Sequence, residues 1–317
     1  MRILKVLAAG LLLASSSVAA EDGEVGSGTV LGKDLKALMA LLPGDYNNYN
    51  QVNFETNGFL GKVLEQGDRH PRLHVRFDAV EIKDRTAVVQ RMFETDEKGK
   101  LSRARVFDFK IDEDKGVIVQ TIYRPSEGQD FKDEVTADKM TAFPAGCEIV
   151  WQRVGLQFEG VMDPTACVIS AGPRKMRVGG DFVINEKGYW HTENLFTDAM
   201  LPIDKKMADS PLELLRANYY TCWIATTDSS DEAEQNFQRP LKVHNQGGIA
   251  RFGPKSDPNK YYFMLKTTLF PVGEWSDVFE MFVHERDNDK AVSYVWTAVD
   301  SPRIGINLRW MQGSCSR

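Results

Sequence analysis

Short runs of alternating apolar and polar residues fill most of the chain after residue 73, and a period of two requires strands rather than helices. In the first run, Leu73, Val75 and Phe77 alternate with polar or charged neighbours. The same period returns in residues 103–111, 117–122, 147–154, 156–162, 174–184 and 188–196. Strands this short and this closely spaced predict an antiparallel sheet.

We expect the sheet to close on itself because it has many strands. An open sheet of so many strands would leave apolar faces and unpaired edges in water. We therefore predict an all-β fold in which this region forms a barrel or a sandwich. One apolar helix precedes it, for which Asp34 is the expected N-cap and Pro43-Gly44 the expected stop. Its apolar positions recur at helical spacing and are Leu35, Leu38, Met39 and Leu42.

The alternation is interrupted after the first series of strands, which predicts a domain boundary. Residues 200–209 are typical of a linker, and Ser210-Pro211-Leu212-Glu213 is typical of a capped helix that we expect to end near residue 218. Strand-like runs then resume as far as residue 312. We predict a first all-β domain over residues 32–199 and a second, smaller one within residues 210–317.

The N-terminus indicates export. Arg2 and Lys5 precede a short apolar run, and small residues follow as far as Ala20, which is the pattern of a secretory signal peptide over residues 1–20. The run is too short for a membrane span of about 20 residues, so we expect no span after cleavage. Residues 21–31 are expected to be a flexible leader. We predict a periplasmic or secreted protein.

Charge and motifs narrow the classes of function. Lys and Arg total 39 and Asp and Glu total 45, so the formal net charge is −6. An acidic chain without a basic cluster is poorly suited to nucleic acid. The motifs of common hydrolases and nucleotide-binding proteins are absent from the sequence. His70 and His74 would lie about 13 Å apart on a strand and could not share a metal ion, so we expect no metal and no cofactor.

Four cysteines in an exported chain suggest two disulfide bonds, for which three pairings exist. We favour Cys147–Cys167 together with Cys222–Cys315, because each bond would then lie within one domain. A zinc site is the alternative. It would need closely spaced pairs of ligands, which the sequence lacks.

Arg103 and Arg105 are the first candidate ligand-binding residues. They alternate on one face of a strand with Phe107, Phe109 and Ile111. If that face lines a barrel, two guanidinium groups lie in a largely apolar interior and need an anionic partner, such as a ligand carboxylate. The alternative places both on the solvated outer face or in structural ion pairs.

The aromatic residues of the strands also allow two interpretations. In the first series they are core residues or a surface for stacking against a flat ligand, and Trp151 is the candidate for such stacking. The tryptophans of the last third indicate packing, and we predict no site there. They are Trp223, Trp275, Trp296 and Trp310.

A set of short motifs between residues 34 and 198 adds a family resemblance. Gly146-Cys147, Phe158-Glu159-Gly160 and Cys167 occur in a specific order and spacing, and Arg103-Ala104-Arg105-Val106-Phe107 forms a second motif. Weaker elements are Gly44, Tyr46, Asn48, Gln51, His74, Arg76 and Gln90. Together they resemble the CpcT/CpeT family of phycobiliprotein chromophore lyases.

The resemblance implies a calycin- or lipocalin-like antiparallel barrel that binds a bilin, an open-chain tetrapyrrole, and attaches it as a thioether to a Cys of an acceptor protein. It implies that Arg103 and Arg105 bind the bilin propionates, with His74 and Gln90 also at the ligand. The family's late Asp-Arg-Gly is Thr192-Glu193-Asn194 here, so Glu193 is the candidate catalytic acid. Ser102 replaces a family tyrosine.

Two functions follow as hypotheses. The first is an exported, chromophore-lyase-like protein that binds a small amphipathic anionic ligand, a bilin or similar tetrapyrrole, and acts as a thioether-forming enzyme by resemblance. The alternative is a non-enzymatic, lipocalin-like protein of the cell envelope that binds a lipid or small apolar ligand. A third, structural reading is a barrel filled by its own side chains.

Overall fold

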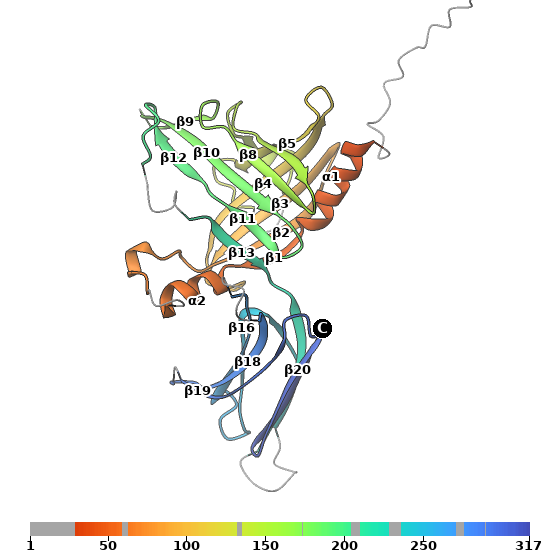
Figure 1. Ribbon diagram of the computed structural model, residues 1–317, viewed down its shortest axis with the longest axis vertical. Coiled ribbons are helices and arrows are strands. Elements are labelled where there is room, and N and C mark those ends of the chain that lie inside the picture. Colours follow the sequence, from red (N-terminus) through yellow and green to blue (C-terminus); the bar gives the residue numbers. More distant parts are fainter. Residues whose placement is uncertain are drawn as a thin grey trace, which may run out of the picture.

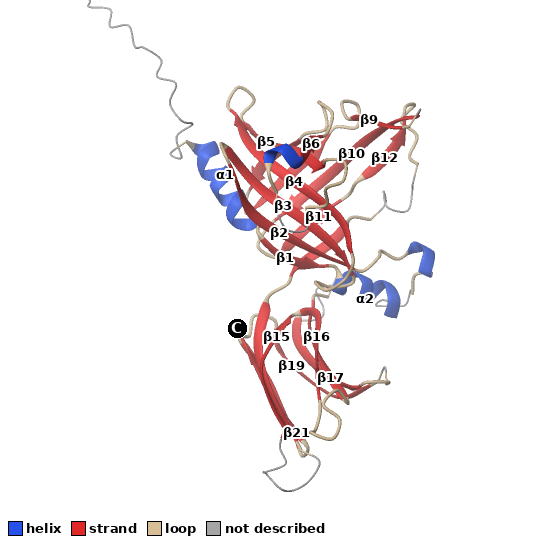
Figure 2. Ribbon diagram, turned by 180° about the vertical axis from the view of Figure 1, so that it is seen from behind, coloured by secondary structure: helices blue, strands red, loops and turns tan. Residues whose placement is uncertain are grey.

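The computed structural model describes residues 29–58, 63–131, 135–172, 174–203, 210–227, 236–270, 276–288 and 290–317, and these residues form mainly strands (Figures 1 and 2). The expected signal peptide and most of the expected leader lie outside the described residues. No described helix is both long enough and apolar enough to span a membrane.

Ten strands close into an antiparallel barrel, as predicted. Around the ring they are β11 (Gly188–His191), β13 (Leu212–Arg216), β1 (Gly44–Asn47), β2 (Leu73–Ile82), β3 (Arg85–Glu94), β4 (Leu101–Asp112), β5 (Val117–Pro125), β7 (Ile149–Val154), β8 (Gln157–Met162) and β10 (Arg174–Ile184). The ring closes because β11 pairs with both β13 and β10. Three short strands extend it, namely β6 (Met140–Ala142), β9 (Val168–Ala171) and β12 (Asn194–Thr197).

The prediction of a helix after Ser210 is wrong. Residues 212–216 form β13, which fills the gap between β1 and β11. Leu212 and Leu214 point into the barrel core, and pairing on both sides satisfies the backbone polar groups of this strand. The barrel therefore uses a strand from beyond the linker predicted at residues 200–209.

One end of the barrel is closed by helix α1 (Val30–Leu41), whose Leu38 is fully buried in the barrel core (Figure 1). The helix begins earlier than predicted, because Thr29, rather than Asp34, is its N-cap and accepts a hydrogen bond from the Gly32 N–H. Asp34 instead pairs with Arg153, 3.1 Å away, in β7.

Beyond the barrel, two four-stranded sheets pack face to face, and we call them the C-terminal sandwich. The first contains β15 (Asn236–His244), β14 (Tyr219–Thr226), β21 (Met311–Ser316) and β20 (Arg303–Leu308), in that order. The second contains β16 (Gln246–Phe252), β17 (Tyr261–Thr268), β18 (Val278–Glu285) and β19 (Ala291–Ala298). A second, smaller all-β unit was predicted for this part of the chain.

Helix α2 (Tyr49–Asn57) lies where the barrel meets the sandwich (Figure 1). The Asn50 side chain both donates to and accepts from the backbone of Leu269 at 3.3 Å. Arg72 donates to the Gly247 carbonyl at 3.0 Å and lies over the Tyr49 ring. The two units are therefore joined by side-chain contacts as well as by the chain.

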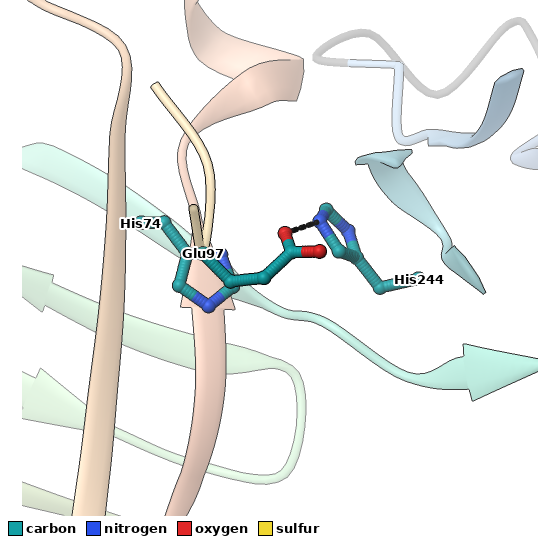
Figure 3. A group of neighbouring side chains, drawn as sticks. All are labelled: His74, Glu97 and His244. Carbon is teal, nitrogen blue, oxygen red and sulfur yellow. Dashed lines mark ion pairs between the residues drawn. The ribbon is translucent and has the colours of Figure 1, made fainter. Parts of the chain in front are cut away.

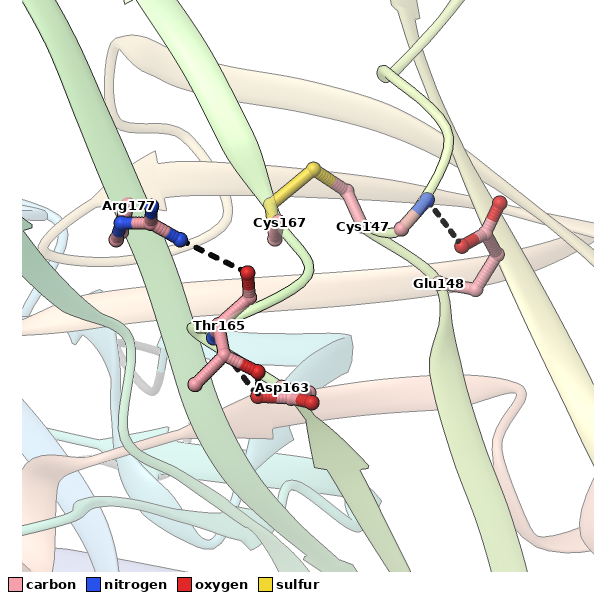
Figure 4. The surroundings of a disulfide bond; sticks show 7 residues. Cys147, Glu148, Asp163, Thr165, Cys167 and Arg177 are labelled. Carbon is pink, nitrogen blue, oxygen red and sulfur yellow. Dashed lines mark hydrogen bonds between the residues drawn. A yellow bond between two sulfur atoms is a disulfide. The ribbon is translucent and has the colours of Figure 1, made fainter. Parts of the chain in front are cut away.

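Both predicted disulfide bonds are confirmed, Cys147–Cys167 in the barrel unit and Cys222–Cys315 in the sandwich. Figure 4 shows the first, which ties the segment before β7 to the segment before β9. Arg177 of β10 donates to the Thr165 carbonyl beside it at 2.8 Å. The described residues contain no free cysteine.

Candidate ligand-binding site

Arg103 and Arg105 lie on the face of β4 that lines the barrel. The strand register aligns Arg105 with Gln90 of β3 and Phe77 of β2, and Phe77 is a core residue of the barrel. The same face of β4 continues to Phe107 and Phe109, which are also in that core. The structure thus places both guanidinium groups inside the barrel, on the interior face that the alternation of β4 defines.

Glu193 is the partner of both arginines. Arg103 Nη1 lies 2.6 Å from Glu193 Oε2, and Arg105 Nη1 donates to Glu193 Oε1. Glu193 lies two residues after the end of β11, which is five strands from β4 in either direction around the ten-stranded ring. The three side chains therefore form an ion-pair cluster that bridges opposite walls of the barrel. We call it the cross-lumen cluster.

The interior remains accessible at the level of this cluster. The side chains of Arg103, Arg105 and Glu193 keep 26%, 17% and 25% of their surface exposed. At the other end, helix α1 and large apolar side chains such as Trp151 and Phe158 fill the barrel. The barrel thus has a packed end and a polar, accessible end.

The charges of the three side chains shift one another's pKa values. Burial alone would raise the pKa of Glu193, but the two guanidinium groups lower it by more, so the carboxylate stays charged. Burial lowers the pKa of Arg105, and Glu193 opposes that effect. With two cations and one anion, the cluster carries a net positive charge, which attracts anionic groups.

Several buried polar atoms on the same interior surface have no hydrogen-bond partner. They are Gln90 Oε1, Arg103 Nε, Gln120 Nε2 and His191 Nδ1. Gln90 and Gln120 are each 1% exposed, and His191 is 6% exposed. A buried polar group without a partner costs about 1–3 kcal/mol, so each of these atoms would gain from a hydrogen bond to a polar guest.

The other predicted residues fall into two groups. Gln90 lies beside Arg105 in the barrel, and Trp151 lies deeper, where its Nε1 donates to Gln120 Oε1 at 2.8 Å. His74 is not at this site. It lies on the outer face of β2, where its Nε2 is 2.8 Å from Asp45 and its ring contacts His244 of the sandwich.

His74, Glu97 and His244 form a candidate metal centre, since one ligand atom of each lies within 4.8 Å of the others (Figure 3). Asp45 would orient the His74 ring by accepting a hydrogen bond from its Nε2, as carboxylates do for the histidine ligands of many metal sites. His244 argues against a metal. Its Nδ1 accepts the Gln246 N–H at 3.2 Å, so the proton stays on Nε2, the nitrogen facing Glu97. The group is better explained as a contact between barrel and sandwich.

Sequence reasoning missed Gln120 and His191. Each is a single polar residue on the apolar face of a short strand, at the position where an interior side chain is expected. That position was the available signal. Gln120 lies between Ile118 and Ile122, and His191 follows Tyr189 at the same two-residue spacing.

No protein-family model matches the chain, and no curated protein matches it. Two solved structures are similar to 57% of it, each over 96% of its own length. One is the T-type phycobiliprotein lyase CpeT from Prochlorococcus phage P-HM1, with 9% identity and a TM-score of 0.33. The other is the CRL protein of Arabidopsis, with 12% identity and a TM-score of 0.40. At these values, neither similarity identifies a ligand or a reaction for this chain.

Proposed function

We propose that the barrel binds an amphipathic, anionic ligand of the tetrapyrrole class at its polar, accessible end. The cross-lumen cluster carries this proposal. Its net positive charge attracts a carboxylate, and guanidinium groups bind carboxylates through two parallel hydrogen bonds. The apolar part of such a ligand would lie against the aromatic core beyond the cluster.

A bilin suits this arrangement because it carries both kinds of group that the cluster can bind. Its two propionates match Arg103 and Arg105, and its pyrrole N–H groups can donate to Glu193. Glu193 would then exchange its arginine partners for the N–H donors, which leaves each guanidinium free for one propionate. The unpartnered Gln90 Oε1 and His191 Nδ1 offer further acceptors for N–H groups.

A lyase reaction extends the same proposal. An acceptor protein would supply a Cys thiol, whose sulfur adds to a carbon–carbon double bond of the bilin while a proton reaches the neighbouring carbon. This addition forms one thioether and needs no oxidant. The protein would contribute positioning, with the charged Glu193 carboxylate accepting from the pyrrole N–H groups, and the proton would come from the thiol. We also propose export, which the two disulfide bonds support.

Titration with biliverdin tests the binding. We expect a shifted or sharpened absorption band in the full-length protein, and loss of at least about tenfold in affinity for Arg103→Ala and for Arg105→Ala, since each removes a charge-assisted contact. Arg174→Ala is the matched control, because Arg174 is an exposed arginine on β10. An unchanged spectrum at saturating biliverdin, or equal affinity in all variants, would refute tetrapyrrole binding.

A second candidate function rests on a different cavity. A groove of about 510 Å³ lies between α1 and the β7–β8 turn, with Ala37, Leu41 and Leu156 among its apolar residues and Lys187 at its rim. It suits an acyl chain with an acidic head group. Native mass spectrometry with palmitate tests this candidate. Binding that Leu156→Asp abolishes and Arg105→Ala leaves unchanged would support a lipid carrier instead.

A further inference from the structure

The C-terminal sandwich carries a small groove on the outer face of the sheet β15-β14-β21-β20. The groove has a volume of about 280 Å³ and lies over β14, β21 and β20. Trp223, Ser314 and Gly305 occupy facing positions on these three strands, in that order. They therefore form one row across the sheet, at right angles to the strands.

The floor of the groove is low because small residues occupy it. Gly305 has no side chain on this face, and Ser314 is the next residue in the row. Gly313, which also lines the groove, is a glycine for another reason. A Cβ there would lie 2.4 Å from Ile224 Cδ1 in the sandwich core. The groove thus depends on Gly305 and Ser314, and a Cβ at Gly305 would lie 3.1 Å from the Gly313 carbonyl oxygen and 3.4 Å from the Ser314 side chain.

One wall of the groove is aromatic. Trp223 lies beside Phe237 of β15, with ring centroids 5.8 Å apart, and Arg239 lies over the Phe237 ring at 5.0 Å. These neighbours support Trp223 from the side away from the groove.

Planar hydrogen-bonding groups lie around the floor of the groove. Arg303 donates from Nε to Ser314 Oγ at 2.9 Å, which orients its guanidinium and leaves both terminal nitrogens to donate. Asn307 and Gln312 face each other across β20 and β21 and both line the groove. Each amide offers a donor and an acceptor. The three groups can therefore bind neighbouring hydroxyls in pairs.

We propose that this groove binds a pyranose ring of a neutral polysaccharide. A pyranose has an apolar C–H face, which an indole can cover, and a ring of hydroxyls that both donate and accept. Trp223 matches the first, and Arg303, Asn307 and Gln312 match the second. The volume suits a single sugar unit. Because the groove opens on the sheet surface, the polymer can continue on either side of it.

The test is to titrate the full-length protein with cellohexaose, laminarihexaose, maltohexaose and chitohexaose, followed by tryptophan fluorescence and calorimetry. We expect at least one of them to bind, with at least about tenfold weaker affinity in Trp223→Ala, since an aromatic contact of this kind contributes on the order of 1.4 kcal/mol. Gly305→Val should abolish binding by filling the floor while Trp223 remains in place.

Trp296→Ala is the matched control. Trp296 is 64% exposed on β19 in the opposite sheet, so its loss removes a surface indole without touching the groove. The affinity of this variant and of Arg105→Ala should equal that of the unmodified protein, which separates saccharide binding from tetrapyrrole binding. If no hexaose binds, or if the Trp223 and Trp296 variants lose affinity equally, the proposal is overturned.

Discussion

The barrel and the C-terminal sandwich are both built from antiparallel strands (Figure 2), yet their polar groups lie on opposite faces of the sheets. In the barrel, Arg103, Arg105 and Glu193 meet in the interior. In the sandwich, the core cluster contains residues such as Phe263 and Phe279, and the candidate groove lies on the outer face.

Geometry explains the contrast. Two stacked sheets lie about 10 Å apart, and apolar side chains from both faces fill that space completely. A closed ring of ten strands encloses a wider interior, which side chains fill at one end and leave accessible at the other. In this molecule the interior candidate site therefore lies in the barrel, whereas the candidate groove of the sandwich lies on its surface.

Removing the disulfide bonds gives the largest expected difference between the two units. Cys222–Cys315 closes a loop with a sequence separation of 93, and Cys147–Cys167 closes one of 20. Chain entropy then predicts that Cys222→Ala/Cys315→Ala lowers the free energy of unfolding by about 4.7 kcal/mol, against about 3.3 kcal/mol for the barrel pair. Urea denaturation with hydrogen exchange, which reports each unit separately, measures both. A larger loss for the barrel pair would contradict the entropic account.

The interior charges provide the next test. Glu193→Ala leaves two guanidinium groups without their carboxylate, and we expect a loss of about 3 kcal/mol, reduced from a fully buried pair because the cluster is partly exposed. Arg103→Met/Arg105→Met/Glu193→Leu replaces the whole cluster by apolar groups. Its stability should stay within about 1 kcal/mol of the unmodified protein while biliverdin binding disappears. A triple variant as unstable as the single one would mean that the cluster serves the fold rather than a ligand.

Acid should weaken the barrel through His191. Burial lowers the pKa of His191 from 6.5 to about 4, so the unfolded chain takes up a proton in this range and the folded chain does not. Stability is therefore lost as the pH falls from about 6.5 towards 4, by about 2 kcal/mol at pH 5.

His191→Phe is the control for this pH dependence. A phenyl ring can keep the stacking on Phe182, where the imidazole now lies with ring centroids 5.9 Å apart, and it cannot titrate. Urea denaturation between pH 7 and pH 5 should show a flatter pH dependence in this variant. An identical slope in both proteins would show that another group causes the loss.

The alternation of strands carried most of what could be predicted from the sequence. It placed Arg103 and Arg105 on one face with Phe107 and Phe109, and the structure has that face inside the barrel. The same rule could have placed His74 outside, because His74 alternates with Val75 and Phe77. The family resemblance pointed the other way for this residue, and the local pattern was the better guide to its orientation.

Two local signals were overridden by contacts distant in sequence. The capped-helix pattern at Ser210-Pro211-Leu212-Glu213 yields to strand pairing, since without β13 the barrel would have two open edges. Asp34 does not cap α1, because the helix already begins at Val30 with Thr29 as its N-cap, and the Asp34 carboxylate accepts instead from Arg153, 119 residues away. Neither partner can be identified from a single sequence, because nothing near Ser210 or Asp34 announces them.

The contact between the two units gives the smallest expected effect. Glu97, in the turn between β3 and β4, lies 3.3 Å from His244 Nε2 of the sandwich, and the imidazole beside it lowers the pKa of Glu97 to about 2. Glu97→Ala should lower the free energy of unfolding by less than about 1 kcal/mol, since the carboxylate is a quarter exposed. Because the pKa is lowered in the folded state, this stabilisation is complete above about pH 4.5 and is lost as the pH falls towards 2.

Scanning calorimetry at pH 7 should show the barrel and sandwich transitions moving apart in Glu97→Ala, and further apart when Asn50→Ala removes a second contact between the two units. Transitions that stay merged in the double variant would mean that the chain connection and the remaining contacts, such as that of Arg72, couple the two units.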